Sequence, residues 1–166
     1  MAHPLTAKSL SYCTHVDPRL IAVVQHALTL SSQDGGFTTE QSRTQAEEDA
    51  LVAKGVSHSH HSHHIIGCPG AAPGYSGAVD LVPWNGVAFV WEWPRVYVLA
   101  AAMLQASIDL ATPVTWGGVW DRLMSDISGK DAAAMQAESS AYAARERAAG
   151  NFHPLLDGPH YELGRN

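Results

Sequence analysis

The segment WPRVYVLAAAMLQASIDL, residues 93–110, is the feature that most restricts how this chain can fold. Its apolar content predicts one long helix that is buried on most sides. It contains the longest nearly continuous apolar run of the chain, which Gln105, Ser107 and Asp109 interrupt. A membrane-spanning helix needs a longer run with fewer polar residues, so other elements of a globular fold must cover this helix.

The rest of the chain mixes helices and short strands. Asp17 as N-cap and Pro18 as first residue predict a helix over 17–32, and further helices are expected at 44–55 and 131–150. We expect strands at 37–43, 77–84, 112–120 and 157–163, a turn at Asn85-Gly86, and a loop over 57–77. This order lacks a regular βαβ alternation. It predicts an α+β fold with a small, mostly antiparallel sheet flanked by helices.

Length and charge limit the classes of function. A chain of 166 residues without repeats or an internal linker favours a single domain over 1–166, with no separate cell-wall-binding domain. The net charge of −6 argues against a nucleic-acid partner and against stable membrane association. The first residues lack the apolar core of a signal peptide. Cys13 and Cys68 favour two free thiols, although a single bridge remains open.

Residues 57–64, SHSHHSHH, form a histidine tract with five histidines between positions 58 and 64, followed by a Gly/Pro/Ala-rich stretch. The tract is compatible with a solvated loop, with a metal-gathering segment, or with one functional ligand among neighbours that have no role. A catalytic zinc site needs about three protein ligands and one open position, so the tract alone cannot complete such a site.

Asp80 and the pair Asp157/His160 supply the other candidates. Asp80 interrupts the apolar segment AVDLV, where an unpaired carboxylate is costly, so a metal, an arginine or backbone donors must compensate it. Asp157 and His160 lie three residues apart across a Gly-Pro turn, a spacing for which an Asx-turn with an exposed histidine is the commoner explanation. One tract histidine with Asp80 and His160 would give a His/Asp/His zinc site. Asp157 could then act on the water that zinc activates.

These segments resemble the zinc peptidases related to lysostaphin, the D-Ala-D-Ala carboxypeptidases and the hedgehog signalling domain. Within that group the chain is most similar to phage endolysins of the L-alanyl-D-glutamate peptidase type. The resemblance covers nearly the whole chain, in the order HVDPRLIAVVQHAL, FTTEQSRTQAEEDALVAKGVS, SHHIIG, SGAVDLVPW, WEWPRVYVLAAAM, WGGVWDRL and DGPHYEL. It implies a hedgehog-like and D-Ala-D-Ala-peptidase-like zinc site.

The resemblance assigns the site by position. It implies that His64, Asp80 and His160 bind Zn²⁺, that Asp157 is the catalytic acid/base, and that Arg43 binds the substrate or steadies developing charge. For Arg43 a structural ion pair is the alternative. Trp116 of the WGG step is expected to lie in the core. The two glycines of this step are expected to allow another part of the backbone to approach closely. One departure is the spacing of sixteen residues between His64 and Asp80, where the compact family pattern has seven.

Because residues 68–76 lengthen that spacing, a neighbouring histidine is an alternative ligand to His64. The remaining tract histidines are expected to be solvated; they are His58, His60, His61 and His63.

The resemblance therefore implies a zinc endopeptidase, an endolysin that hydrolyses the L-Ala–D-Glu bond of the peptidoglycan stem peptide and lyses the cell wall. The alternatives are a D,D-carboxypeptidase or dipeptidase acting at D-Ala, a non-catalytic zinc-binding module, and a histidine-rich metal chaperone. The endolysin hypothesis implies a monomer that is made in the host cytoplasm and reaches the periplasm and cell wall after holin-type release.

Overall fold

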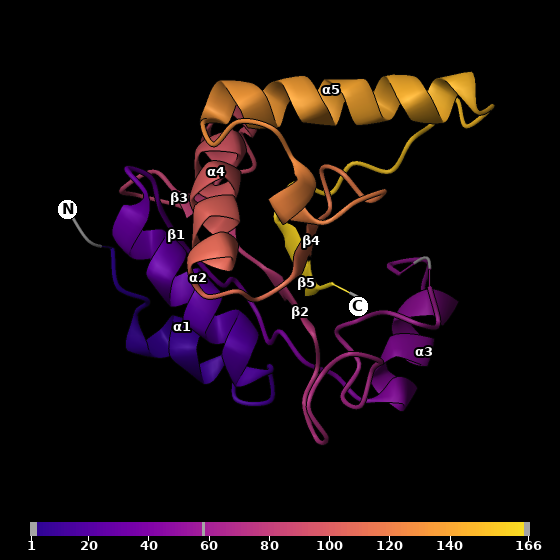
Figure 1. Cartoon of the computed structure of the whole chain (residues 1–166). Coiled ribbons are helices and arrows are strands. Elements are labelled where there is room, and N and C mark those ends of the chain that lie inside the picture. Colours follow the sequence, from indigo (N-terminus) through magenta and orange to yellow (C-terminus); the bar gives the residue numbers. More distant parts are fainter. Residues whose placement is uncertain (1–2, 58, 165–166) are drawn as a thin grey trace.

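Helix α4 (Trp93–Asp109) lies at the centre of the computed structural model, which describes residues 3–57 and 59–164 (Figure 1). It packs against α2 (Pro18–Leu30) and α5 (Ala132–Ala148). Leu99, Met103 and Leu104 of α4 are fully buried. The long apolar helix predicted from the sequence is thus confirmed, and the burial that its composition requires comes from the two other long helices.

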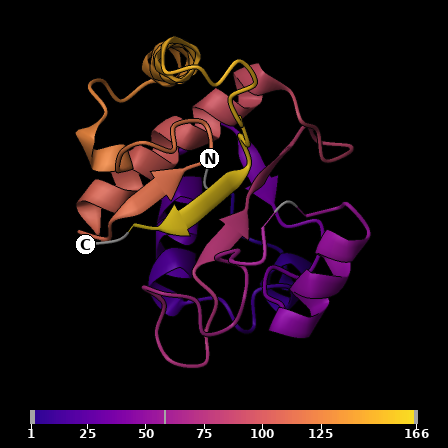
Figure 2. The ribbon, with the colours of Figure 1, turned by 90° about the vertical axis from the view of Figure 1, so that its right-hand side faces the viewer.

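Two small antiparallel sheets complete the fold. In the larger, β5 (His160–Leu163) lies between β2 (Ala78–Asp80) and β4 (Val114–Trp116), as Figure 2 shows. In the smaller, β1 (Asp34–Gly36) pairs with β3 (Val82–Trp84). In Figure 2, α4 and α2 lie behind the larger sheet, and its other face is turned to the viewer. The predicted α+β class with a small, mostly antiparallel sheet is confirmed.

Three shorter elements connect these parts. Helix α1 (Ala7–Ser11) and the 3₁₀ turn Met124–Asp126 were not expected, because each is too short to show a periodic pattern. Helix α3 (Gln45–Ala53) starts with a capping box between Thr44 and Glu47. It ends before Gly55, whose φ of 71° is a conformation that glycine adopts without strain.

Two strand predictions need correction. Residues 37–43 do not form a strand; the strand of this region is the preceding Asp34–Gly36. Residues 77–84 form two strands that belong to different sheets, with Leu81 between them. The stretch 37–43 is instead an irregular segment, in which the Gln41 N–H donates to the Tyr12 carbonyl. This hydrogen bond holds Gln41 next to the candidate site.

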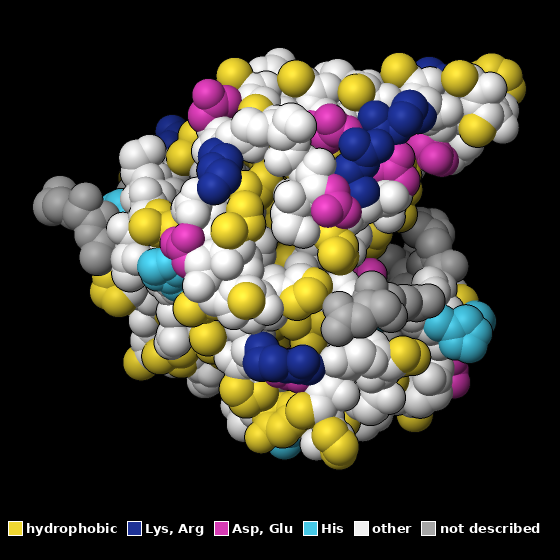
Figure 3. All heavy atoms as spheres, viewed as in Figure 1, with side chains coloured by type: hydrophobic (Ala, Val, Ile, Leu, Met, Phe, Trp, Pro, Cys, Tyr) yellow, Lys and Arg dark blue, Asp and Glu magenta, His cyan; other side chains and the backbone are white. Residues whose placement is uncertain are grey.

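The surface carries paired charges beside α5. Arg145 contacts both Asp121 and Glu138, and Arg122 contacts the same two carboxylates. Figure 3 shows Lys/Arg and Asp/Glu side chains gathered there, below the helix. Within this network the opposite charges largely neutralise one another. Across residues 3–57 and 59–164, no helix is long and apolar enough to cross a membrane. Both cysteines are buried free thiols.

The stretch 68–76 is anchored to the start of α2 through Asp17. The buried Asp17 carboxylate accepts hydrogen bonds from the Arg19 side chain and from the Ala72 N–H at 2.7 Å. Arg19 also donates to the Gly70 carbonyl at 2.9 Å. The hydrogen bonds from Arg19, against an opposing effect of burial, lower the pKa of Asp17 to about 2. One carboxylate thus caps a helix and holds a long loop.

Replacing Asp17 with asparagine is expected to lower the free energy of unfolding by about 2 kcal/mol at pH 7. Because the folded-state pKa is depressed, this stabilisation is present above the unfolded-state pKa of about 3.9. It is lost as the pH falls through about 2, and about half of it is gone at pH 3. Urea denaturation of both proteins at pH 7 and pH 3 measures it. If the two proteins differed in free energy of unfolding by the same amount at pH 7 and pH 3, an electrostatic role of Asp17 would be contradicted.

Candidate metal centre

The pairing of β2 with β5 brings the first two candidate ligands together. The register places Asp80 directly opposite His160. Directly opposed residues in an antiparallel pair have their Cβ atoms about 4.5–5.5 Å apart, so their side chains can meet. The Asp80 Oδ1 and His160 Nδ1 atoms lie 3.2 Å apart. Two residues that are eighty positions apart in the sequence therefore share one point in space.

His64 reaches the same point from the loop that follows α3. The Arg43 N–H donates to the His64 carbonyl, and the Ile66 N–H donates to the Arg43 carbonyl, each at 2.9 Å. The Gly67 N–H then donates to the Tyr75 carbonyl, which closes the excursion 68–74 at its base. The added residues thus form a closed loop whose two ends meet, and His64 stays next to Asp80. This accounts for a His–Asp spacing of sixteen.

The three candidate ligand atoms have separations close to those of a tetrahedral zinc site. His64 Nε2 lies 3.3 Å from His160 Nδ1 and 3.4 Å from Asp80 Oδ1, and the third separation is 3.2 Å. Zinc bonds to nitrogen and carboxylate oxygen are about 2.0–2.2 Å, which gives ligand–ligand separations of about 3.3–3.6 Å at tetrahedral angles. The group could therefore hold a metal ion of this size.

Both histidine rings are held through the nitrogen that does not face the shared point. The His64 Nδ1–H donates to the Gln41 carbonyl at 2.7 Å, and His160 Nε2 lies 3.1 Å from the Glu162 carboxylate. The Gln41 side chain also accepts from the Asp80 N–H at 2.6 Å. Carbonyl and carboxylate partners of this kind fix the tautomer and orientation of metal-binding histidines.

The charges at this point favour a bound cation. Burial acts to raise the pKa of Asp80, but hydrogen bonds from His160 and His64 outweigh it and hold that pKa well below its usual range. Burial acts to lower the pKa of His160, yet Asp80 and Glu162 together raise it to about 9. The two carboxylates thus stabilise positive charge where the rings meet.

Asp157 lines the same cleft, which has a volume of about 390 Å³. The surface is hollowed on the right-hand side of Figure 3, between α3 and the region below α5. Burial raises the pKa of the half-buried Asp157 carboxyl above its ordinary value; the opposing effect of His160 and the like charge of Asp80 are smaller. A raised pKa suits a carboxyl group that must both accept and release a proton near neutrality.

The backbone of Asp157 is fixed by Gly117. The Asp157 N–H donates to the Gly117 carbonyl at 2.9 Å. A side chain at position 117 would collide with the Asp157 carbonyl oxygen, so only glycine allows this approach. Trp116 is fully buried, and its indole N–H donates to the Gly158 carbonyl. The WGG step thus places a core tryptophan and a close backbone contact, both as expected.

Replacing Gly117 with alanine is expected to lower kcat by roughly 10²-fold, because a displacement of about 1 Å at a catalytic group has that effect. Metal is expected to be retained, because the added methyl group would face the Asp157 carbonyl and Trp120 rather than a ligand side chain; the contact of Gly117 with His160 is the backbone hydrogen bond from its N–H to the His160 carbonyl. Zinc content and turnover of peptidoglycan measure the two effects separately. Gly74→Ala is the control for general backbone strain away from the cleft: its φ of 85° disfavours alanine, but nothing lies within 4 Å of a Cβ there. Equal losses in both variants would contradict the argument.

Arg43 lines the cleft and is also ion-paired. Its Nε lies 3.0 Å from Glu48 Oε2, and the Glu48 side chain is completely buried. The Ser57 hydroxyl donates to the other Glu48 oxygen. The structure therefore contains the ion pair that was the alternative for Arg43, and it also leaves about a quarter of the Arg43 side chain exposed in the cleft.

The other tract histidines lie in different surroundings. His60 and His61 are exposed as expected, and His60 contacts Asp49. His63 is buried rather than solvated, so that expectation is wrong; its Nδ1 lies 3.6 Å from Glu162. The peptide chain around it is fixed because the Gly77 N–H donates to the His63 carbonyl. His58 lies outside the described residues.

Sequence reasoning missed several residues around the metal group. Glu162 is two positions after His160 on one strand, and that period-two spacing was an available signal. Gln41 and Glu48 gave no signal, because each looks like an ordinary polar residue before or within an exposed helix. Trp120, whose ring lies 5.1 Å from that of His160, was not distinguished from the core aromatic residues.

A family model of phage L-alanyl-D-glutamate peptidases matches residues 1–138. The chain belongs to this family. It is accordingly an endolysin-type hydrolase that cleaves the L-Ala–D-Glu bond of the peptidoglycan stem peptide, as the sequence resemblance implied. The match ends before Asp157 and His160, so the place of these two residues comes from the structure: the register of β5 sets His160 opposite Asp80, and Asp157 lines the cleft.

A solved structure supports the fold over almost the full length. The L-Ala D-Glu endopeptidase ChiX of Serratia marcescens superimposes with a TM-score of 0.65 at 23% identity, covering 98% of this chain and 91% of that one. No curated protein sequence matches the chain. The His64–Asp80–His160 group, as a site able to hold a metal, agrees with a metallopeptidase.

Proposed function

We propose that this peptidase uses zinc, with His64, Asp80 and His160 as the metal ligands. The observation that carries the proposal is the set of three ligand-atom separations, 3.2, 3.3 and 3.4 Å, which match a tetrahedral site. Two imidazoles and one carboxylate suit zinc, and the open fourth position suits catalysis rather than a purely structural metal. The partner that this site serves is the stem peptide of bacterial peptidoglycan.

Bound zinc would supply Lewis-acid polarisation of the scissile carbonyl and acidify a water molecule. Asp157 would take the proton from the attacking water as its oxygen bonds to the L-Ala carbonyl carbon. The same carboxyl group would then deliver that proton to the D-Glu nitrogen as the C–N bond breaks. Its raised pKa favours this return of the proton.

Arg43 would bind a substrate carboxylate or stabilise the oxyanion that develops on the scissile carbonyl. The guanidinium remains charged at any working pH and presents several donors in one plane. Glu48 occupies its Nε, which leaves the terminal nitrogens for the substrate. Glu48 would therefore act as a positioning residue for Arg43.

Replacing Glu48 with glutamine is expected to lower kcat/KM by about 10-fold to 10²-fold through misplacement of Arg43. Zinc content should not change. Glu92→Gln is the matched control, since Glu92 also pairs with an arginine, Arg95, but is largely exposed. Steady-state kinetics on a synthetic stem peptide, below the unfolding temperature of each variant, measure the effect. Equal kinetics in the two variants would contradict a positioning role for Glu48.

Product analysis tests the activity itself. Purified peptidoglycan is digested with the zinc-loaded protein, and the fragments are identified by mass spectrometry. The proposal expects new L-Ala carboxyl termini and new D-Glu amino termini. Release of free D-Ala would instead indicate the D,D-carboxypeptidase alternative, and intact peptidoglycan with one zinc per chain would indicate a non-catalytic module.

The proposal extends to where the protein acts. The chain would work as a monomeric, single peptidase domain that is made in the host cytoplasm and meets its substrate after holin-type release. The phage family supports this view. Expression in a bacterial host with and without a holin tests it, because lysis without the holin would contradict the proposed route.

A further inference from the structure

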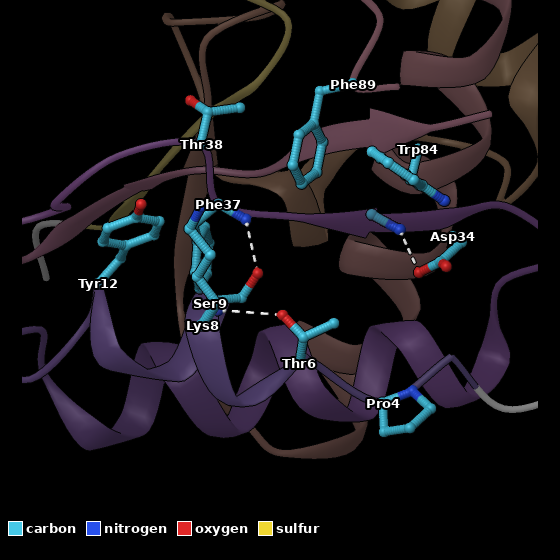
Figure 4. A pocket seen from close by; sticks show the side chains of 11 residues that line it. Pro4, Thr6, Lys8, Ser9, Tyr12, Asp34, Phe37, Thr38, Trp84 and Phe89 are labelled. Carbon is cyan, nitrogen blue, oxygen red and sulfur yellow. Dashed lines mark hydrogen bonds between the residues drawn. The ribbon is translucent and has the colours of Figure 1, made fainter. Parts of the chain in front are cut away.

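A second pocket lies away from the metal centre and shares no lining residue with the cleft of Asp157. It has a volume of about 430 Å³ and is enclosed by the N-terminal segment, α1, β1, β3 and the turn after β3. Figure 4 shows it from close by. Volumes of about 300–1,000 Å³ are typical of small-molecule sites. The proposed mechanism gives this pocket no role.

Aromatic rings form much of its wall. Trp84 and Phe89 meet edge to face, with ring centroids 5.0 Å apart. Tyr12 lies at the opposite end, and Lys8 Nζ lies 6.0 Å from its ring centroid. In Figure 4, Phe89 points into the pocket between Tyr12 on one side and Trp84 on the other. Tyr12, Trp84 and Phe89 are all partly exposed, so a ligand can reach their surfaces.

The backbone of β1 contributes to the pocket without offering an edge for a peptide strand. The Phe37 N–H donates to Ser9 Oγ, and the Gly35 N–H donates to the Asp34 carboxylate. A side chain at Gly36 would meet Ser9 Oγ and the Phe89 ring, so the glycine keeps this space open. These donors are already used, which makes β-strand addition of a peptide unfavourable here.

The polar groups suit hydroxyl groups instead. Asp34 is half-buried; its Oδ1 accepts from the Gly35 N–H and its Oδ2 lies 3.8 Å from His3 Nδ1, which leaves acceptor capacity on both oxygens. Thr6 and Thr38 add exposed hydroxyl groups at the pocket wall. A ring with apolar C–H faces and a polar rim would pack against the aromatic side chains and bind Asp34 through its hydroxyls.

We propose that this pocket binds an N-acetylhexosamine ring of the glycan strand of peptidoglycan. The proposal rests on the family's activity on peptidoglycan, whose stem peptides are joined to the sugar through L-Ala. β3 ends at Trp84, only four residues after Asp80. Extended chain rises about 3.3 Å per residue, so the Cα atoms of Asp80 and Trp84 lie at most about 13 Å apart. Sugar binding at this pocket keeps the enzyme on the polymer while the cleft acts on stem peptides.

Titration of the wild-type protein with N,N′-diacetylchitobiose, followed by NMR, tests binding directly. Resonances of pocket residues such as Phe89, Trp84 and Gly36 are expected to shift, while those of His64 and Asp157 stay in place. Shifts only in the metal cleft, or none up to the solubility limit of the sugar, would overturn the proposal. Pocket shifts caused by an N-acetylated stem peptide and not by the sugar would assign the pocket to peptide instead.

Phe89→Ala tests the function of the pocket, with Val87→Ala in the adjoining exposed turn as control. Loss of one aromatic contact is expected to weaken sugar binding and slow cleavage of intact peptidoglycan by about threefold to tenfold. Cleavage of the sugar-free, N-acetylated stem peptide should not change. An equal loss on both substrates, or on neither, would overturn the proposal. Failure of the wild type to cleave the free peptide would count against the proposed catalytic function. The sugar titration would still decide whether the pocket binds the sugar, because it measures binding and not cleavage.

Discussion

Replacing His64 with alanine is expected to remove both bound zinc and peptidase activity. The His64 ring is one of the three proposed protein ligands, and its Nδ1–H already donates to the Gln41 carbonyl. Loss of a histidine's outer partner alone typically costs ~10–100-fold in metal affinity, so loss of the ligand itself should exceed that range. Zinc content after dialysis, measured by elemental mass spectrometry, and digestion of peptidoglycan give the two results.

His60→Ala is the matched control for that experiment. His60 belongs to the same tract, but its side chain is more than half exposed and contacts Asp49 rather than the site. It should keep one zinc per chain and full activity. If His64→Ala retained its zinc, another histidine of the tract would be the ligand. If the wild type bound several zinc ions that were lost in His60→Ala, the tract would be a metal-gathering segment.

The helices were predictable because the residues that they bury recur at helical spacing along the sequence. In α2, Leu20, Val24 and Leu28 recur every four residues and are all buried, after an Asp-Pro start that also stands out in the sequence. The strand at 37–43 was wrong because its alternation is weak and its course is fixed by tertiary contacts. The true strand contains Gly35 and Gly36, whose pairing with Pro83 and Val82 no local propensity indicates.

The site was partly predictable for a different reason. Asp80 was conspicuous because a carboxylate interrupts an apolar strand, and His160 because it follows Asp157 across a Gly-Pro turn. That the two face each other depends on the register of β2 and β5, which the sequence alone does not specify. Gln41 could not be found, because its contribution is largely a backbone carbonyl, and every residue has one.

Replacing Asp157 with alanine is expected to lower kcat by about 10²–10⁴-fold, the usual contribution of a general acid–base group. Zinc should remain bound at one ion per chain, because Asp157 is not among the three proposed ligands. The backbone contact to Gly117 does not involve the side chain, so the fold around the cleft should persist. This separates Asp157 from His64, whose loss removes metal and activity together.

Asp157→Asn sharpens the same test. Asparagine keeps the size of the side chain and most of its packing but cannot take up or return a proton at neutral pH. A loss as large as that of Asp157→Ala, with zinc retained, would show that proton transfer is what the carboxyl group provides. Asp126→Ala, at an exposed position of the 3₁₀ turn, is the control for removing a carboxylate. If Asp157→Asn kept near-normal kcat, the carboxylate would be needed for binding at most, and the acid/base would have to be a different group in the cleft.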